Sequence, residues 1–468
     1  MGLRFFILQK EVKLMNTSNK MADMPIKKLM ISMGLPMIIS MMLQAVYNIV
    51  DSAFVGRIKD VGEEALNALT LAFPIQMLII AIAIGTGVGM GAVVSMQLGQ
   101  KNKEQANKTA GNALLLALII FIIFLMFGLF GADAYISSQT SNHVIKDMSV
   151  SYLKICCVFS FGIVFFSIFE KLLQSTGKSI YSTIAQISGA ITNIILDPIL
   201  IYGLIGFPEF GVKGAAYATI IGQIVSLVVA IIFHLSKNKE IENNIIFLKP
   251  SGKIIRQIYS IGIPAIIAQA LMSVMTYGLN LILVRIDEAV VTAYGIYYKI
   301  QQFVLFAAFG LRDAITPIVS FSYGSQNKKR INDGIKYGLI YTVGIMIIGT
   351  IFLEVTALPL SALFGLSGET KKICVTAIRV ISVSFAFAGA NIAFQGIFQA
   401  VECGIESLII SICRQFLFVI PVAWIFSKIV GNNTDMVWLV WVTFIIAEIL
   451  SFLIGWVMLK RMRLKKNI

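Results

Sequence analysis

Residues 31–57 read ISMGLPMIISMMLQAVYNIVDSAFVGR, an apolar stretch long enough to cross a bilayer as a helix. A hydrocarbon core about 30 Å thick needs ~20 apolar residues of helix. Within the stretch, Pro36 removes a backbone hydrogen-bond donor, and Asp51 places an ionisable group where burying an unpaired charge is costly. A membrane helix that carries both a proline and a carboxylate is expected to be a moving part.

The rest of the chain has the same character. Hydrophobic residues make up 57% of the 468 positions and charged residues 13%, and the apolar segments are long and nearly continuous. The sequence therefore predicts an all-α integral membrane protein. The net charge of +14 does not indicate a nucleic-acid partner, because the basic residues gather at helix ends. The first twenty residues lack the cleavage site of a secretory signal, so we expect none there.

Twelve transmembrane helices are predicted, with both termini in the cytoplasm and the plasma membrane as the location. With the N-terminus inside, 25 lysine and arginine residues lie on the cytoplasmic side against 9 on the other, as the positive-inside rule requires. The predicted spans are 30–56, 70–96, 112–131, 150–173, 180–205, 214–235, 258–284, 292–322, 335–354, 376–398, 405–428 and 437–459.

An internal repeat divides these spans into two halves. The segment ISMGLP that ends at Pro36 matches YSIGIP, which ends at Pro264, 228 residues later. Gly99 and Asn102 return at nearly this spacing as Gly324 and Asn327. Because each half holds six spans, an even number, both halves have the same orientation and are parallel repeats. We predict two pseudo-symmetric six-helix bundles, which either rock about a central cavity or only preserve a gene duplication.

The repeat also sets the expected domains. They are a cytoplasmic N-terminal tail, an N-lobe, a cytoplasmic linker, a C-lobe and a basic C-terminal tail, at residues 1–27, 28–236, 237–257, 258–460 and 461–468.

The two halves differ in their carboxylates. Asp51 and Asp197 align with Leu279 and Ile420, so both acids belong to the first half alone. Asn193 lies four residues before Asp197 and shares its helix face. Two acids facing each other in a low dielectric cannot both stay charged without a partner, so a shared site is expected to take up a proton or a sodium ion.

Neutral oxygens from Asn193 and Thr219 are candidates to complete such a cation site. The alternative for Asp51 is a charge that reaches water near a helix end. Asp197 is harder to explain structurally, because it lies within a long apolar run.

Soft and aromatic side chains on the expected cavity faces suit a promiscuous apolar pocket, although they could equally pack a core or face lipid. The candidates are Tyr47, Met272, Met275, Tyr298 and Phe303.

The remaining charges in the spans receive structural interpretations. Glu170 and Lys171 lie at a span end and are expected at the membrane–water interface. Arg312 and Glu448 could pair and hold the second lobe together. The alternating glycines Gly85 to Gly91 lie inside an apolar span, where close helix packing is expected and phosphate binding is not.

Several function classes lack their motifs. The chain has no GxxxxGK[ST] for ATP, no GxSxG nucleophile and no zinc spacing among its five cysteines and two histidines. We therefore expect no enzyme activity, no cofactor and no use of ATP.

Taken together, these features resemble the multidrug and toxic compound extrusion (MATE) family, in its DinF/MepA-like branch, over most of the chain. The resemblance rests on LPMIIS and YNIVDSAFVGR in the first span, QLGQKNK after the second, QSTGK after the fourth and NIILDP in the fifth. It implies a cation site at Asp51, Asn193, Asp197 and Thr219, a first-helix bend at Pro36, and Tyr47 beside the site.

The resemblance further implies a proton- or sodium-coupled antiporter, expected as a monomer, that exports amphipathic and mostly cationic drugs by alternating access. The sequence departs from the NorM-like branch, because its seventh and tenth spans hold no acidic residue. A flippase for a lipid-linked oligosaccharide is the alternative. It would need basic residues in its cavity, for which only Lys299 and Arg312 are candidates.

Overall fold

The computed structural model describes residues 20–468 except 60, 243, 365 and 432, so most of the expected N-terminal tail lies outside the described residues. All its regular elements are helices. They are α2 (Lys20–Asp23), α3 (Ile26–Val55), α4 (Gly62–Gly99), α5 (Lys103–Met126), α6 (Ala132–Ser137), α7 (His143–Val158), α8 (Phe161–Ser175), α9 (Ser179–Tyr202), α10 (Val212–Lys237), α11 (Gly252–Leu283), α12 (Glu288–Gly324), α13 (Lys328–Leu363), α14 (Gly368–Ser382), α15 (Phe385–Ala400), α16 (Gly404–Ile412), α17 (Val419–Val430) and α18 (Trp438–Lys466), with short 3-10 and π turns between some of them.

The predicted count of twelve spans is confirmed for the described residues. Ten helical segments are long and apolar enough to cross a membrane, and two bent pairs supply the others. In these pairs α7 meets α8 at 43° and α14 meets α15 at 55°. Most helices extend beyond the predicted apolar segments, since a helix continues into the polar headgroup region. The fifth span is shorter than predicted, because Gly203 adopts a left-handed backbone (φ 69°) and caps α9.

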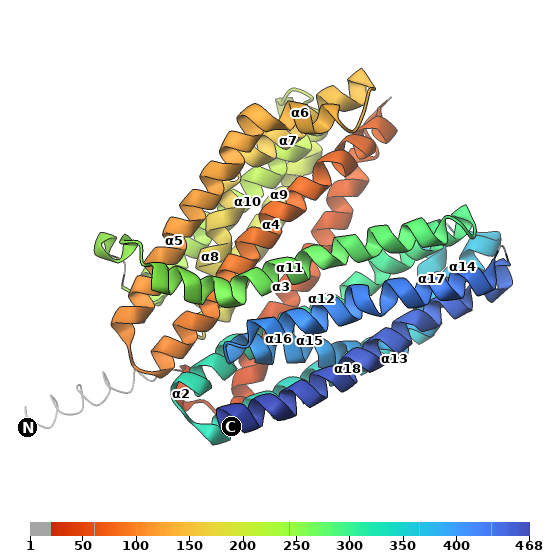
Figure 1. Ribbon diagram of the computed structural model, residues 1–468. Coiled ribbons are helices and arrows are strands. Elements are labelled where there is room, and N and C mark those ends of the chain that lie inside the picture. Colours follow the sequence, from red (N-terminus) through yellow and green to blue (C-terminus); the bar gives the residue numbers. More distant parts are fainter. Residues whose placement is uncertain (1–19, 60, 243, 365, 432) are drawn as a thin grey trace, which may run out of the picture.

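Two bundles form the molecule (Figure 1). Helices α3 to α10 form the N-lobe and α11 to α18 the C-lobe, each with its own buried apolar cluster. The bundles converge at the end that carries α2 and the C-terminus, and they diverge toward the opposite end. We call the first of these the convergent end.

The first helix of each lobe begins in the other lobe. One face of the early part of α3 is buried with residues of α12, α13 and α15, through Ile26, Leu29, Met30, Met33 and Met37. In the same way Ile254 and Ile258 of α11 are buried in the N-lobe cluster. Each of these helices therefore belongs partly to both lobes.

The repeat seen in the sequence appears as reciprocal contacts between the lobes. A Cβ on Gly99 of α4 would lie 2.1 Å from the Phe321 carbonyl oxygen of α12, and one on Gly324 of α12 would lie 2.0 Å from the Met96 carbonyl oxygen of α4. Only glycine permits backbones to approach this closely. The repeated asparagines cap α5 and α13 alike, because Asn102 accepts from the Gln105 N–H and Asn327 from the Arg330 N–H, each at 3.1 Å.

Hydrogen bonds from asparagine side chains hold Glu242 and Ser251, in the segment between α10 and α11, against the N-lobe. Asn107 of α5 accepts from the Glu242 N–H at 3.0 Å, and Asn112 accepts from the Ser251 N–H at 2.8 Å. At the N-terminal end, Arg330 of α13 donates to the carbonyls of Met21 and Met24. Lys20 approaches the α8–α9 turn of the N-lobe, where burial and the charge of Lys178 lower its pKa.

Candidate functional site

The two candidate carboxylates lie close together inside the N-lobe. Asp51 is one turn from the end of α3, and α3 packs against α9, which carries Asp197. Asp197 is fully buried and lies close enough to interact electrostatically with Asp51. Asn193, one turn before Asp197, donates its Nδ2 hydrogen to Asp197 Oδ1 at 3.2 Å. The structure thus brings together three of the four predicted site residues.

This group has more acceptors than donors. Three of its buried oxygens, Asp51 Oδ1, Asp197 Oδ2 and Asn193 Oδ1, have no hydrogen-bond partner among the described residues. Buried polar atoms are normally paired, so three unpaired acceptors in one place are unusual. Oxygen ligands are what a proton or a hard cation such as sodium prefers.

A polar network that sequence reasoning missed borders the carboxylates. Gln76 of α4 donates to Tyr152 Oη at 3.2 Å and contacts Cys156 Sγ at 3.3 Å, and both partners lie on α7. Tyr152 and Cys156 interact electrostatically with Asp51. The available signals were the amide of Gln76 within an apolar stretch of α4 and the four-residue spacing of Tyr152 and Cys156. Each is weak alone.

Tyr47 and Thr219 lie near the same site. Tyr47, one turn before Asp51 on α3, lies close enough to both carboxylates for their charges to act on it. Thr219 is half-buried on α10, which packs against α9. One turn further along α10, a Cβ on Gly222 would lie 3.1 Å from Asn193 Cβ. Thr219 is therefore close in depth to the carboxylates but forms no hydrogen bond with Asn193 or Asp197.

Pro36 lies inside α3, which remains one continuous helix from Ile26 to Val55. Its neighbours Gly34 and Ile38 touch α12 of the C-lobe, at Leu311 and Gly310. The proline thus lies where α3 leaves the C-lobe on its way to the N-lobe carboxylates.

The other proposed cavity residues belong to the C-lobe. Met275 is buried in the C-lobe cluster, and Met272 and Tyr298 pack against it. Phe303 is half-buried on α12. These positions therefore combine packing with partial exposure, and their role in binding stays a prediction.

The predicted Arg312–Glu448 pair is wrong. Glu448 of α18 pairs instead with Arg414, with 2.7 Å between Nη2 and Oε1. Arg312 pairs with the adjacent Asp313 at 2.9 Å. The expectation that Glu170 and Lys171 reach the membrane–water interface is also wrong. Both side chains are buried in α8, where this helix meets the C-lobe.

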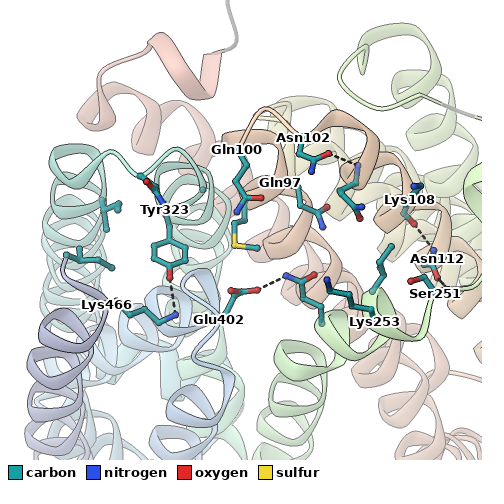
Figure 2. A pocket seen from close by; sticks show the side chains of 18 of the residues that line it. Gln97, Gln100, Asn102, Lys108, Asn112, Ser251, Lys253, Tyr323, Glu402 and Lys466 are labelled. Carbon is teal, nitrogen blue, oxygen red and sulfur yellow. Dashed lines mark hydrogen bonds between the residues drawn. The ribbon is translucent and has the colours of Figure 1, made fainter.

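A cleft of about 1190 Å³ lies between the lobes at the convergent end. Figure 2 shows Gln100, Asn102 and Lys108 on the N-lobe side and Tyr323 and Lys466 on the C-lobe side. Lys466 donates to Tyr323 Oη at 3.2 Å. The cleft is lined by five lysines and one glutamate, and the carboxylates Asp51 and Asp197 are not among its lining residues.

Comparison with known proteins decides the family. The family model described as MatE matches residues 36–199 and 264–425. The chain belongs to the MatE family. The two matched segments begin 228 residues apart, the spacing of the repeat read from the sequence.

Relatives and solved structures agree with this assignment. The multidrug export protein MepA of Staphylococcus haemolyticus is 27% identical over 439 residues, which cover 94% of this chain and 95% of the relative. MepA of Staphylococcus aureus strain MRSA252 is 26% identical over 88% of this chain and 90% of the relative.

The solved structures include one described as the outward-facing conformation of a multidrug resistance MATE family transporter of the MOP superfamily. Its TM-score is 0.88 at 26% identity, with coverage of 96% of this chain and 98% of that chain. A crystal structure of MATE in complex with MaL6 gives the same values. The protein is thus a multi-pass membrane transporter of the MATE family, as the sequence predicted.

Proposed function

We propose that this MATE transporter is a proton- or sodium-coupled antiporter that exports amphipathic, mostly cationic drugs from the cell. The observation that carries the proposal is the group of three unpaired oxygens on Asp51, Asn193 and Asp197. A proton or sodium ion bound there would satisfy acceptors that no described protein donor satisfies. The names of the relatives, multidrug export proteins, support the export of drugs.

The proposed mechanism uses the position of α3 between the lobes. Binding of the coupling ion cancels one negative charge of the Asp51–Asp197 pair, and this changes how the later part of α3 packs within the N-lobe. Because the early part of α3 is buried in the C-lobe, the change is transmitted to the lobe interface. For antiport, the ion and the drug must favour different states, so that each promotes release of the other.

The proposed orientation places both termini in the cytoplasm and the protein in the plasma membrane. With that orientation the divergent end of Figure 1 faces outward, and the conformation corresponds to the drug-releasing state. The transporter is proposed to act as a monomer without a cofactor or ATP. Arg312, one of the two basic residues considered for the flippase alternative, is already engaged by Asp313.

Transport in proteoliposomes tests the proposal. The uptake of a fluorescent organic cation is measured with an imposed pH gradient and then with an imposed sodium gradient. One of the two gradients is expected to drive uptake by the wild type. Asp51→Asn and Asp197→Asn should each lower it about 5- to 150-fold, the usual span of a coupling free energy.

A matched control is Asp287→Asn, which changes an exposed carboxylate at the N-cap of α12, where asparagine caps equally well. This control should transport like the wild type. Wild-type uptake in both Asp51 and Asp197 variants would refute the coupling site. If neither gradient moves any cationic dye in the wild type, binding of a polyprenyl pyrophosphate, measured by native mass spectrometry, tests the flippase alternative.

A further inference from the structure

A buried ion pair joins the two lobes near the convergent end. Lys171 of α8 donates from Nζ to Asp313 Oδ2 of α12 at 2.6 Å, and both side chains are about 5% exposed. Among the ion pairs of the described residues, this one alone links α3–α10 to α11–α18. Lys171 lies one turn from the end of α8, against Gly87 and Gly91 of α4.

Each member of this pair has a second partner in its own lobe. Lys171 also donates to Gln174 Oε1 at 3.0 Å and lies 3.8 Å from Glu170 Oε2. Asp313 also accepts from Arg312 Nε at 3.1 Å and Nη2 at 2.9 Å. The formal charges of Glu170 and Lys171 cancel on α8, and those of Arg312 and Asp313 cancel on α12.

These second partners lower the free-energy cost of separating the lobes. Breaking a buried ion pair is normally costly, because it leaves an uncompensated charge. Here the lobes could part with Lys171 held by Glu170 and Gln174, and Asp313 held by Arg312. The other buried pair differs, since Arg414 and Glu448 both lie in the C-lobe and Arg414 hydrogen-bonds to Glu448 alone among the described side chains.

The surroundings of the pair are suited to repeated opening. It borders a cavity of about 20 Å³ that Val88, Ala92, Thr316 and Pro317 also line, which is room for about one water molecule. Lys171, Asp313 and Thr316 supply polar groups at this otherwise largely apolar cavity, so a water molecule there would have partners as the charges separate.

We propose that Lys171 and Asp313 form a reversible latch that closes the convergent end, and that exchange of partners within each lobe opens it. The latch holds the conformation of Figure 1, and it must break whenever the lobes part at the convergent end. The inference deepens the proposed function, on which its role in transport rests, by naming the positioning residues that set the balance between the two lobe arrangements.

Spin-label distances across the divergent end test the latch without measuring transport. Nitroxides are placed at Arg57→Cys and Arg285→Cys, two exposed residues at equivalent repeat positions in the N-lobe and C-lobe. The native cysteines within the described residues are all buried, so the engineered pair is labelled selectively. Double electron–electron resonance then reports the fraction of molecules in which the divergent ends have come together.

Lys171→Met is expected to raise the ratio of the short to the long distance at least about fivefold, the lower end of typical coupling free energies. Asp313→Asn should shift the ratio in the same direction, whereas Lys171→Arg should restore the wild-type distribution. The matched control is Lys146→Met, which removes the Lys146–Asp133 pair between α7 and α6 of the N-lobe and should leave the ratio unchanged. Folding of each variant is checked by its thermal transition.

An unchanged ratio in both Lys171→Met and Asp313→Asn would overturn the latch, and so would an equal shift in Lys146→Met. The two proposals fail separately in these experiments. If the wild type transports no dye but the Lys171 and Asp313 variants show the expected distance shift, the antiporter is refuted and the latch stands. Normal coupled transport without any shift would refute the latch and leave the antiporter.

Discussion

At the scale of single residues, the C-lobe is held by a buried ion pair that takes the place of the predicted one. Arg414 reaches Glu448 through Nε at 3.0 Å and Nη2 at 2.7 Å, and Asn391 donates to Glu448 Oε2 at 2.7 Å. Arg414 lies in a π-helical turn, Cys413–Leu417. Such a turn inserts one residue and changes which face of the helix points inward, so regular helical spacing does not place Arg414 correctly.

Removal of Glu448 is expected to destabilise the protein. In Glu448→Ala the Arg414 guanidinium stays buried without its carboxylate, which costs about 3–5 kcal/mol. The double variant Arg414→Met with Glu448→Ala should recover most of that loss, because no charge is then left unpaired. Thermal unfolding in detergent measures both. Equal stability of the single and double variants would show that the charge of Arg414 is compensated elsewhere.

The candidate site shows which residues can be predicted from sequence. Asp197 and Asn193 were found because both are polar within one apolar run and share a helix face. Gln76 and Tyr152 could not be predicted as neighbours of the site, because the hydrogen bond that joins them links residues 76 positions apart in the sequence. Lys171 was misjudged for the same reason, as its partner Asp313 lies 142 residues later, in the other lobe.

At the scale of elements, α4 acts as a packing surface for both lobes. Its alternating glycines form two stripes of four-residue spacing. Gly85 and Gly89 face α11 of the C-lobe, and Gly87 and Gly91 face α8 of the N-lobe. Sequence predicted close packing correctly, but it did not reveal that two different helices are the neighbours. The breaks after α7 and α14 were also not predicted, because no proline marks either one.

The two stripes provide a matched pair of substitutions. In Gly89→Ala the new Cβ would lie 2.2 Å from the Ile258 carbonyl oxygen, a clash with backbone that the neighbouring helix must relieve by moving. We expect a loss of about 1–3 kcal/mol. In Gly91→Ala the nearest atoms are 3.6 Å away, and alanine favours a helix by about 0.5–1 kcal/mol, so this variant should be neutral or stabilised. Thermal unfolding compares them, and equal behaviour would contradict the packing seen around α4.

At the scale of the whole molecule, exchange of the leading helices links the two lobes mechanically. The early part of α3 is buried in the C-lobe and the early part of α11 in the N-lobe. Relative movement of the lobes therefore requires a change within these two helices. Each carries a proline there, Pro36 within the early part of α3 and Pro264 just after the early part of α11. The twelve-span architecture was predictable because bilayer thickness fixes span length. The exchange of α3 and α11 between the lobes was not predictable, because hydropathy does not show which helices pack against each other.

If the lobes must part at the convergent end during transport, a covalent tether there should stop it. Gln100 of the N-lobe and Lys328 of the C-lobe are both exposed and line the same cleft. Reaction of Gln100→Cys with Lys328→Cys through a cleavable thiol crosslinker is expected to abolish dye uptake, and reduction of the crosslinker should restore it. The control pair, Lys328→Cys with Lys466→Cys, lines the same cleft within the C-lobe alone and should transport normally when crosslinked. Undiminished uptake by a fully tethered Gln100–Lys328 pair would mean that the lobes stay together at this end, and transport would then need a path that α3 and α11 open without lobe separation.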